Sequence, residues 1–236
     1  MPVFSFKKFD IQQDKAAMKV GTDAVILGAF SDISNQPQTI LDVGAGTGIL
    51  ALMLAQRCGA EIIDAIEIDD AAYLECVDNF ENSPWGYRLF CYHGDFAELV
   101  EDSEYGYDLI ISNPPFYLNQ HFAENESRTT ARFADKLQPE FFFSCAADLL
   151  TETGTVQIIV PEVDHPVWVN AAKKAELQLR HRMIIYPMPG KAAKRTVLQF
   201  GFDAVAVTES ELTVEESRGN YTAQYREATK DFHPKF

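Results

Sequence analysis

The stretch Asn113-Pro-Pro-Phe116 directly follows the apolar residues 107–112. Proline fixes its own φ angle near about −65° and keeps the preceding residue out of the helical region. The Asn113 side chain and the Pro114 carbonyl can therefore be held facing one point, and two converging acceptors suit a planar NH2 group. Phe116 can stack on the ring that carries this group. The motif predicts methyl transfer to an amino nitrogen.

A glycine-rich turn, Asp42-Val-Gly-Ala-Gly-Thr-Gly48, lies between a β-branched run that begins at Ile40 and an apolar stretch at 49–55. This succession predicts a strand, a tight turn and a helix. Glycines let a ligand approach the backbone closely. A dinucleotide fingerprint, G-x-G-x-x-G, would need its third glycine at Ile49, whereas the third glycine here is Gly48. The spacing therefore disfavours a pyrophosphate ligand.

Two further apolar runs end in acidic residues. Glu67 ends the run 62–67, about 20 residues after the glycine turn, where a strand-terminal acid can bind ribose hydroxyls. The predicted strand 87–92 leads into Asp95 and Phe96, which could bind an adenine amino group and cover its ring. Taken singly, each acid would more often be a solvated loop residue or a helix cap. Their order along successive strand ends favours one shared site.

The motifs resemble those of class I S-adenosylmethionine-dependent methyltransferases, in the amino-methylating branch with an Asn-Pro-Pro-aromatic motif. Within that branch the chain is similar to the bacterial family that methylates adenine N6 beside the anticodon of valine tRNA. The closer similarity rests on three stretches, which are 9–28, residues 42–48 with 65–69, and 221–232.

This resemblance implies S-adenosyl-L-methionine as the cofactor and assigns a role to each matching residue. The implied cofactor-binding residues are Thr22, Asp23, Asp42, Gly44, Gly46, Glu67, Asp95, Phe96 and Asn113. Asn113 and Pro114 would accept the two amino hydrogens of the target adenine, and Phe116 would stack on the base. Family members often have tyrosine at the position of Phe116, so stacking is kept here and a phenol hydrogen bond is lost.

The resemblance implies an α/β fold, a Rossmann-like seven-stranded, mostly parallel sheet with helices on both faces. The sequence predicts one domain over 1–236, with a helical N-terminal cap at 1–38, a catalytic core at 39–202 and a C-terminal extension at 203–236.

The apolar content is 47%, and no apolar run reaches the ~18 residues of a membrane span. The N-terminus lacks a signal-peptide core, and the four cysteines are scattered. A cytoplasmic, metal-free and monomeric protein is expected.

The net charge of −15 opposes a nucleic-acid partner, because binders of phosphate are usually basic on at least one face. The charge is unevenly distributed, since residues 61–108 hold 14 acids and one base, Arg88. Residues 173–195 are rich in bases, and they form either an RNA-binding surface or a solvated basic face.

The long polar segment 117–140 is predicted to be a substrate lid. The candidate tRNA contacts are Pro115, Arg128, Arg132, Lys194 and Arg195.

Three alternatives remain open. Another amino group of RNA could be the target. Enzymes that methylate a glutamine side-chain amide also carry Asn-Pro-Pro-aromatic, but their separate N-terminal helical domain is missing from the roughly 38 residues before the glycine turn. A non-catalytic nucleotide-binding module would leave the intact residues Asn113, Pro114 and Phe116 without a purpose.

Overall fold

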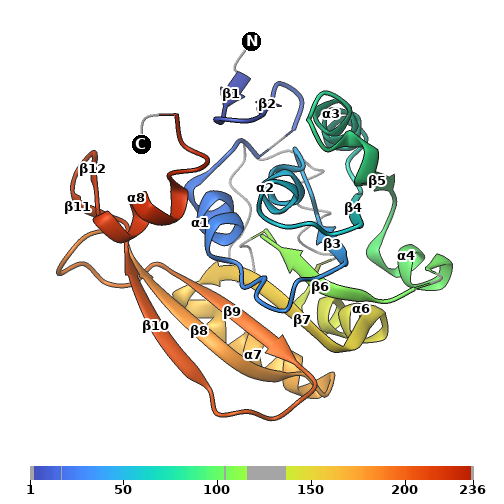
Figure 1. The fold of residues 1–236 in the computed structure, drawn as a ribbon. Helices are drawn as coiled ribbons and strands as arrows, with labels where there is room; N and C mark the ends of the chain where they lie inside the picture. The colour runs from blue at the N-terminus through green and yellow to red at the C-terminus, as the bar shows by residue number, and fades with distance from the viewer. Residues whose placement is uncertain (1–2, 17, 104, 116–136, 235–236) are drawn as a thin grey trace, which may run out of the picture.

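The structure, a computed structural model, describes residues 3–16, 18–103, 105–115 and 137–234. Eight strands form its central sheet: β3 (Thr39–Val43), β4 (Ile62–Glu67), β5 (Leu89–His93), β6 (Tyr107–Ser112), β7 (Leu150–Pro161), β8 (Gln178–Tyr186), β9 (Arg195–Gly201) and β10 (Thr208–Thr213). Their order is β10-β8-β9-β7-β6-β3-β4-β5 (Figure 1). Neighbouring strands are parallel except where β9 meets β7 and β8.

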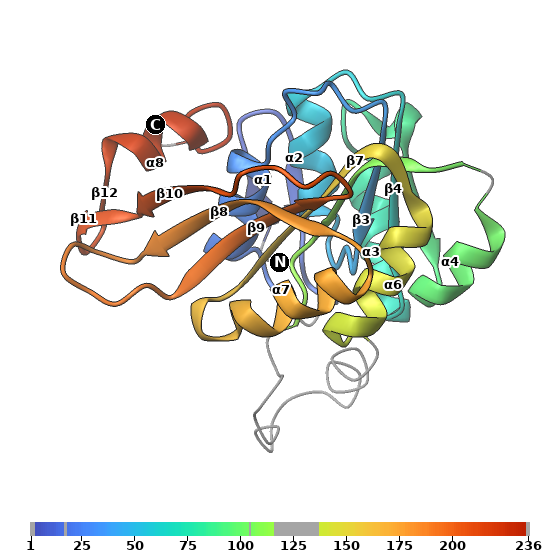
Figure 2. The ribbon, with the colours of Figure 1, turned by 90° about the horizontal axis from the view of Figure 1, so that it is seen from below.

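Helices cover both faces of the sheet (Figures 1 and 2). Between the sheet and the helices, each face has one cluster of buried apolar residues. One face carries α1 (Thr22–Phe30), α2 (Ile49–Arg57) and α3 (Asp70–Glu81). The other carries α4 (Phe96–Asp102), α6 (Pro139–Leu149) and α7 (His165–Lys174). Short 3-10 helices, η1 (Gly86–Arg88) and η2 (Glu162–Asp164), precede β5 and α7. The predicted α/β fold with a mostly parallel sheet is confirmed.

The sheet has one strand more than the seven predicted. The additional strand, β10, lies in the segment that the sequence assigned to a C-terminal extension, and it pairs in parallel with β8 at the edge of the sheet. Within β10, Leu212 is the fully buried residue, and most of the others are polar. An edge strand needs only one apolar contact with the core, and so β10 carries no strong periodic pattern.

The expectation of a helical cap is wrong for residues 3–12. They form an antiparallel hairpin of β1 (Val3–Ser5) and β2 (Asp10–Gln12), and α1 is the helix that follows. The rings of Phe6 and Phe9 stack with centroids 4.6 Å apart, and Phe6 also meets Phe232 at 6.4 Å. The hairpin is therefore held by aromatic packing against the C-terminal end of the chain.

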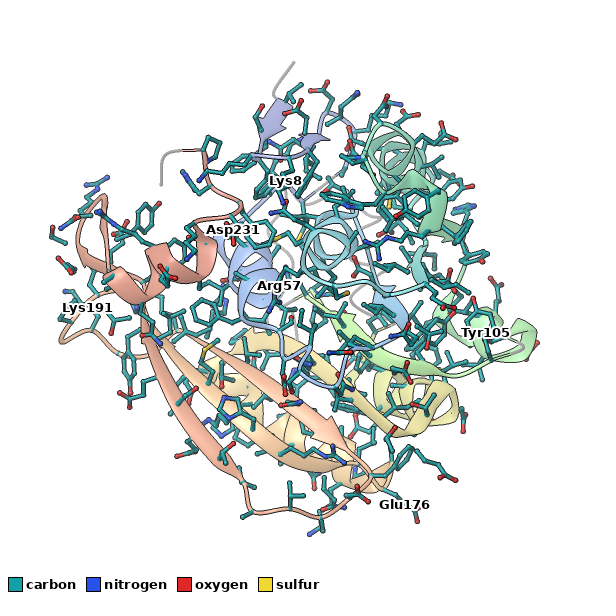
Figure 3. The ribbon with its side chains drawn as sticks, viewed as in Figure 1. Lys8, Arg57, Tyr105, Glu176, Lys191 and Asp231 are labelled. Atoms are coloured by element: carbon teal, nitrogen blue, oxygen red, sulfur yellow. The ribbon has the colours of Figure 1, made fainter. Side chains whose placement is uncertain are left out.

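The C-terminal segment returns to the first face of the sheet. It comprises the hairpin β11 (Glu215–Ser217) and β12 (Asn220–Tyr221), followed by α8 (Ala223–Thr229), which contacts α1 and β10. The Lys7 N–H donates to the Phe232 carbonyl at 2.9 Å, which joins the ends directly. The helices beside the site are tied together as well, because Arg57, near the centre of Figure 3, donates to the Gly28 and Ser31 carbonyls.

Candidate active site

The site lies where the chain reverses its direction across the sheet. From β3 the chain runs outward to β4 and β5, and it returns to place β6 on the other side of β3. Ligands of open parallel sheets bind in the crevice outside the strand ends at such a point. The glycine turn occupies this crevice, with Gly44, Gly46 and Gly48 at φ angles of 72°, 57° and 77°. These left-handed conformations are the reason why the turn needs glycine.

Two carboxyl groups lie beside the glycine turn. Asp42 is fully buried at the end of β3, where Oδ2 accepts the Ala51 N–H at 3.2 Å and Oδ1 accepts no hydrogen bond within the described residues. Burial raises the pKa of Asp42 to about 7, and the charge of Glu67 adds to this while the Ala51 N–H opposes it. Asp42 is therefore an incompletely paired acid at the centre of the site.

Glu67 ends β4, and its side chain bonds both to the glycine turn and to the residue before α3. Its two carboxylate oxygens accept the Gly46 and Asp69 N–H groups, each at 2.8 Å. Burial raises the pKa of Glu67, and these N–H groups oppose the rise. The residue is 5% exposed. Glu67 thus lies at the predicted place, with its oxygens already bonded to backbone, and its role as a ribose ligand stays a prediction.

Asn113 lies at the end of β6 and next to the glycine turn. The pairing of Asp42 with Ile111 sets the register of β3 and β6, and the Ser112 hydroxyl donates to the Val43 carbonyl at 2.7 Å. The Asn113 Oδ1 atom is buried, and no donor in the described ranges reaches it. Both prolines that follow are buried. A buried carbonyl oxygen without a partner is costly, so this acceptor is suited to a ligand donor.

A small pocket lies beside the ends of β3 and β4. Its apolar walls come from Val43, Ile66, Ile68, Phe96 and Leu137, and it also touches Asp95. Asp95 caps α4 through a reciprocal capping box with Glu98, so the interpretation of this acid as a helix cap holds in part. The ring of Phe96 packs at 5.8 Å from Phe142 and is held in place. The predicted contact of Asp95 and Phe96 with an adenine ring stays a prediction.

The N-terminus of α1 and the start of β9 meet beside the site. Asp23 accepts a hydrogen bond from Arg195 Nε at 2.7 Å, and Thr22 is exposed at the start of the helix. A predicted cofactor contact and a predicted tRNA contact are thus paired with each other. Lys194, the next candidate, is exposed. The roles of these four residues in binding stay predictions.

The basic residues between 173 and 195 are largely matched by acids. The ion pairs are Lys174–Glu140, Arg180–Asp203, Arg182–Glu162, Arg182–Glu209 and Arg195–Asp23. Figure 3 places Lys191, in the β8–β9 connection, on the side of the molecule opposite Tyr105, which belongs to the acid-rich segment 61–108. The one base of that segment, Arg88, is buried and donates to three backbone carbonyls. The basic segment is therefore much less cationic than its composition indicates.

Three predicted site residues, Phe116, Arg128 and Arg132, and most of the predicted lid lie outside the described residues. Among the residues that the structure does describe, no group of three or more histidine, cysteine or acidic side chains could hold a metal ion. No helix in the described ranges has the length and apolar character needed to cross a membrane.

Sequence reasoning missed two site-adjacent residues on α3. Glu75 and Asn79 are 3% and 2% exposed, and they bond to the segment before α1 and to the glycine turn. Polar residues on a helix usually face solvent, and only their place among Ala72, Cys76 and Phe80 on the buried face of α3 could have indicated burial.

Two substitutions in the glycine turn should differ in their cost to the stability of the fold. An alanine Cβ at Gly48 would lie 2.5 Å from Phe80 and 2.8 Å from Cys76, whereas one at Gly46 would meet nothing within 4 Å. We expect Gly48→Ala to lower the free energy of unfolding by about 2 kcal/mol or more, through backbone strain and overpacking. Gly46→Ala should cost about 1 kcal/mol from strain alone. Thermal denaturation of both variants tests this, and equal losses would contradict it.

Comparisons with known proteins identify relatives of this chain. The family model for the methyltransferase small domain matches residues 3–164. A protein of Flavobacterium psychrophilum, named tRNA1(Val) (adenine(37)-N6)-methyltransferase, is 46% identical over 99% of this chain and 100% of its own length. A protein of Bacteroides fragilis with the same name is 37% identical over 99% of this chain and 98% of its own.

Solved structures show the same fold. A predicted O-methyltransferase from Agrobacterium tumefaciens superposes with a TM-score of 0.69 at 17% identity, covering 89% of this chain and 96% of that one. A ribosomal protein L11 methylase from Lactobacillus delbrueckii superposes with a TM-score of 0.52 at 20% identity, covering 75% of this chain and 76% of that one. The full-length matches are the stronger finding, and by them this chain belongs to the methyltransferase small domain family and, within it, to the bacterial tRNA1(Val) (adenine(37)-N6)-methyltransferases.

Proposed function

We propose that the protein transfers a methyl group from S-adenosylmethionine to the N6 amino group of adenine 37 in a valine tRNA, the target named for its relatives. The observation that carries the proposal is the buried Asn113 Oδ1, an acceptor without a donor in the described chain, held beside the glycine turn. An exocyclic NH2 group would supply the missing donor. A cytoplasmic, monomeric state remains a prediction.

The residues around the glycine turn fit the proposed cofactor. A cationic ligand would complete the pairing of Asp42, whose Oδ1 is buried without a donor among the described residues. The open space at Gly46 admits a group against the backbone, and the apolar residues around Phe96 would border an adenine ring. Glu67 would hold the ribose by exchanging one of its backbone donors for a hydroxyl. When bound, this cofactor supplies an electrophilic methyl group.

Asn113 would act by orientation. An exocyclic amine is a poor nucleophile because its lone pair is delocalised into the ring. Acceptors from the Asn113 amide and the Pro114 carbonyl would favour a more pyramidal nitrogen whose lone pair points at the methyl group. Catalysis then rests on positioning and electrostatic preorganisation. The methylated nitrogen would carry one extra proton and lose it to water after the transfer. No strong base is required. The predicted stacking of Phe116 on the base would fix the plane of the ring.

The substrate must present an unstacked adenine. A tRNA loop offers such a base at lower free-energy cost than a duplex does. Because the bases between 173 and 195 are mostly paired with acids, phosphate contacts would fall to exposed lysines such as Lys191 and Lys194. We therefore expect binding to depend on the shape of the loop and on the inserted base more than on total charge, with a modest salt dependence.

The test is incubation of the protein with radiolabelled S-adenosylmethionine and unmodified bulk tRNA, followed by digestion and identification of the labelled nucleoside. The proposal predicts label in N6-methyladenosine. Label in another nucleoside would move the target to a different RNA amino group. No label in RNA, from a protein that binds the cofactor, would contradict the proposal and direct attention to glutamine side chains of proteins.

A further inference from the structure

Helix α3 buries two polar side chains that belong to none of the groups described for the reaction. Glu75 and Asn79 are one turn apart and therefore lie on the same face of the helix. They are 3% and 2% exposed, and that face points toward the N-terminal segment. Buried charged and amide groups destabilise a protein unless they are fully hydrogen-bonded, so their partners are informative.

The carboxylate of Glu75 binds three successive backbone N–H groups. Its oxygens accept from Asp14 at 2.6 Å, from Lys15 at 3.0 Å and from Ala16 at 2.8 Å. These partners are about 60 residues away along the chain. Charge-assisted bonds to backbone N–H groups are roughly twice as strong as neutral ones. Glu75 therefore fixes the course of the chain immediately after β2.

Asn79 binds both the N-terminal segment and the glycine turn. Its Oδ1 accepts the Gln12 N–H at 2.8 Å, and its Nδ2 donates to the carbonyls of Gln12 at 3.0 Å and Thr47 at 2.9 Å. Thr47 lies between Gly46 and Gly48 in the turn that borders the proposed cofactor site. One amide group thus sets the distance between the turn and the chain that enters from β2.

The connection from β2 to α1 is also held by hydrogen bonds between its first and last residues. Gln13 Oε1 accepts the Val20 N–H at 2.7 Å, and the Lys19 ammonium donates to the Gln13 carbonyl. We call the described residues 12–16 and 18–21 the N-terminal connector. It runs from the end of β2 to the start of α1, where Asp23 meets Arg195. The connector therefore borders the proposed cofactor site, and its anchors are Glu75 and Asn79.

We infer that Glu75 and Asn79 are positioning residues for cofactor binding, which hold the N-terminal connector against the glycine turn. This inference rests on the proposed function. In their absence the cofactor itself would have to order the connector. The free energy needed for this ordering would weaken the binding of the cofactor by the same amount. The two residues touch neither substrate nor reacting atoms, so the chemical step of the bound complex should be left intact.

The test uses Glu75→Gln and Asn79→Asp, two changes that keep the size of the side chain. The first removes the negative charge and places an NH2 group among three N–H donors. The second removes the two amide N–H donors and leaves a carboxylate facing two carbonyls. Asp78→Asn is the matched control, because Asp78 is an exposed acid on the same helix. Cofactor affinity is measured by calorimetry, and hydrogen exchange reports on the connector and on β3.

We expect the Kd for S-adenosylmethionine to rise by about tenfold or more in Glu75→Gln and Asn79→Asp. The kcat at saturating cofactor should stay within about twofold of the wild type. Amides of the connector should exchange faster while those of β3 keep their protection. Asp78→Asn should match the wild type in all three readouts.

Two results would overturn the inference. One is unchanged cofactor affinity in both variants. The other is a joint loss of affinity, kcat and β3 protection, which would make the pair part of the general fold. Failure of the proposed function gives a different result, because the wild-type protein would then bind no S-adenosylmethionine or would methylate no tRNA.

Discussion

Replacing Asn113 with alanine is expected to lower methyl transfer, at saturating cofactor and tRNA, by about 10²- to 10³-fold, the loss seen when one preorganised polar group is removed from an active site. The change removes the acceptor that would orient the amino nitrogen. Because Asn113 Oδ1 bonds to no donor in the described parts of the chain, its removal breaks no hydrogen bond there. The melting temperature should therefore stay near the wild-type value, and saturating cofactor keeps the implied contact between Asn113 and the cofactor from affecting the measured rate. Single-turnover kinetics measures the chemical step directly.

Asn113→Asp is the matched control for this prediction. Aspartate keeps the shape and an acceptor oxygen at the same place, so it should retain more activity than alanine does. A wild-type rate in Asn113→Ala would show that Asn113 does not orient the amine. An equal loss of rate in both variants accompanied by unfolding would also exclude that role, because the residue would then support the fold and not the reaction.

The second large effect concerns the pH dependence of cofactor binding. Burial raises the pKa of Asp42 to about 7, from an ordinary value of 3.8. The carboxyl is therefore mostly protonated at about pH 6 and mostly ionised at about pH 8, and a cationic ligand favours the ionised form. The affinity for S-adenosylmethionine should rise about tenfold between these two pH values and then level off. Calorimetric titration across this range provides the measurement.

Asp42→Asn should abolish that pH dependence and bind the cofactor about tenfold more weakly at about pH 8. The same shift has a consequence for the free protein. Because the folded-state pKa lies above the unfolded one, the stability contributed by the protonated group is fully present below the ordinary pKa of 3.8 and is lost as the pH rises through about 7. Asp42→Asn should remove this loss. A slope of affinity with pH that survives in Asp42→Asn would assign the proton to another group, such as Glu67.

The local parts of the fold were predictable from sequence because their signals are local. The glycine turn, the acids at strand ends and the Asn-Pro-Pro motif each follow an apolar run, and parallel strands bring such ends together. The hairpin β1–β2 has strands of three residues, too short for a periodic pattern, and its stability comes from Phe232 at the far end of the chain. The order of the strands depends on pairings between distant segments, which no local pattern in the sequence carries.

The electrostatics of the site depended on contacts that sequence does not contain. Arg195 and Asp23 are 172 residues apart, yet they form an ion pair. Glu75 appears in the sequence as one more acid in an acidic stretch, whereas in the structure it is a buried ligand of three N–H groups. Composition counts charges, and only tertiary structure shows which of them are already neutralised.

Methylation of N6 of adenine 37 in a valine tRNA can be tested at the target base itself. Two transcripts of that tRNA, one with adenine at the target position and one with guanine there, are compared under the same conditions with labelled S-adenosylmethionine. We expect one methyl group per adenine-containing transcript, found as N6-methyladenosine, and none in the guanine-containing transcript. Equal labelling of both transcripts, or no labelling by a protein that binds the cofactor, would show that this adenine is not the target.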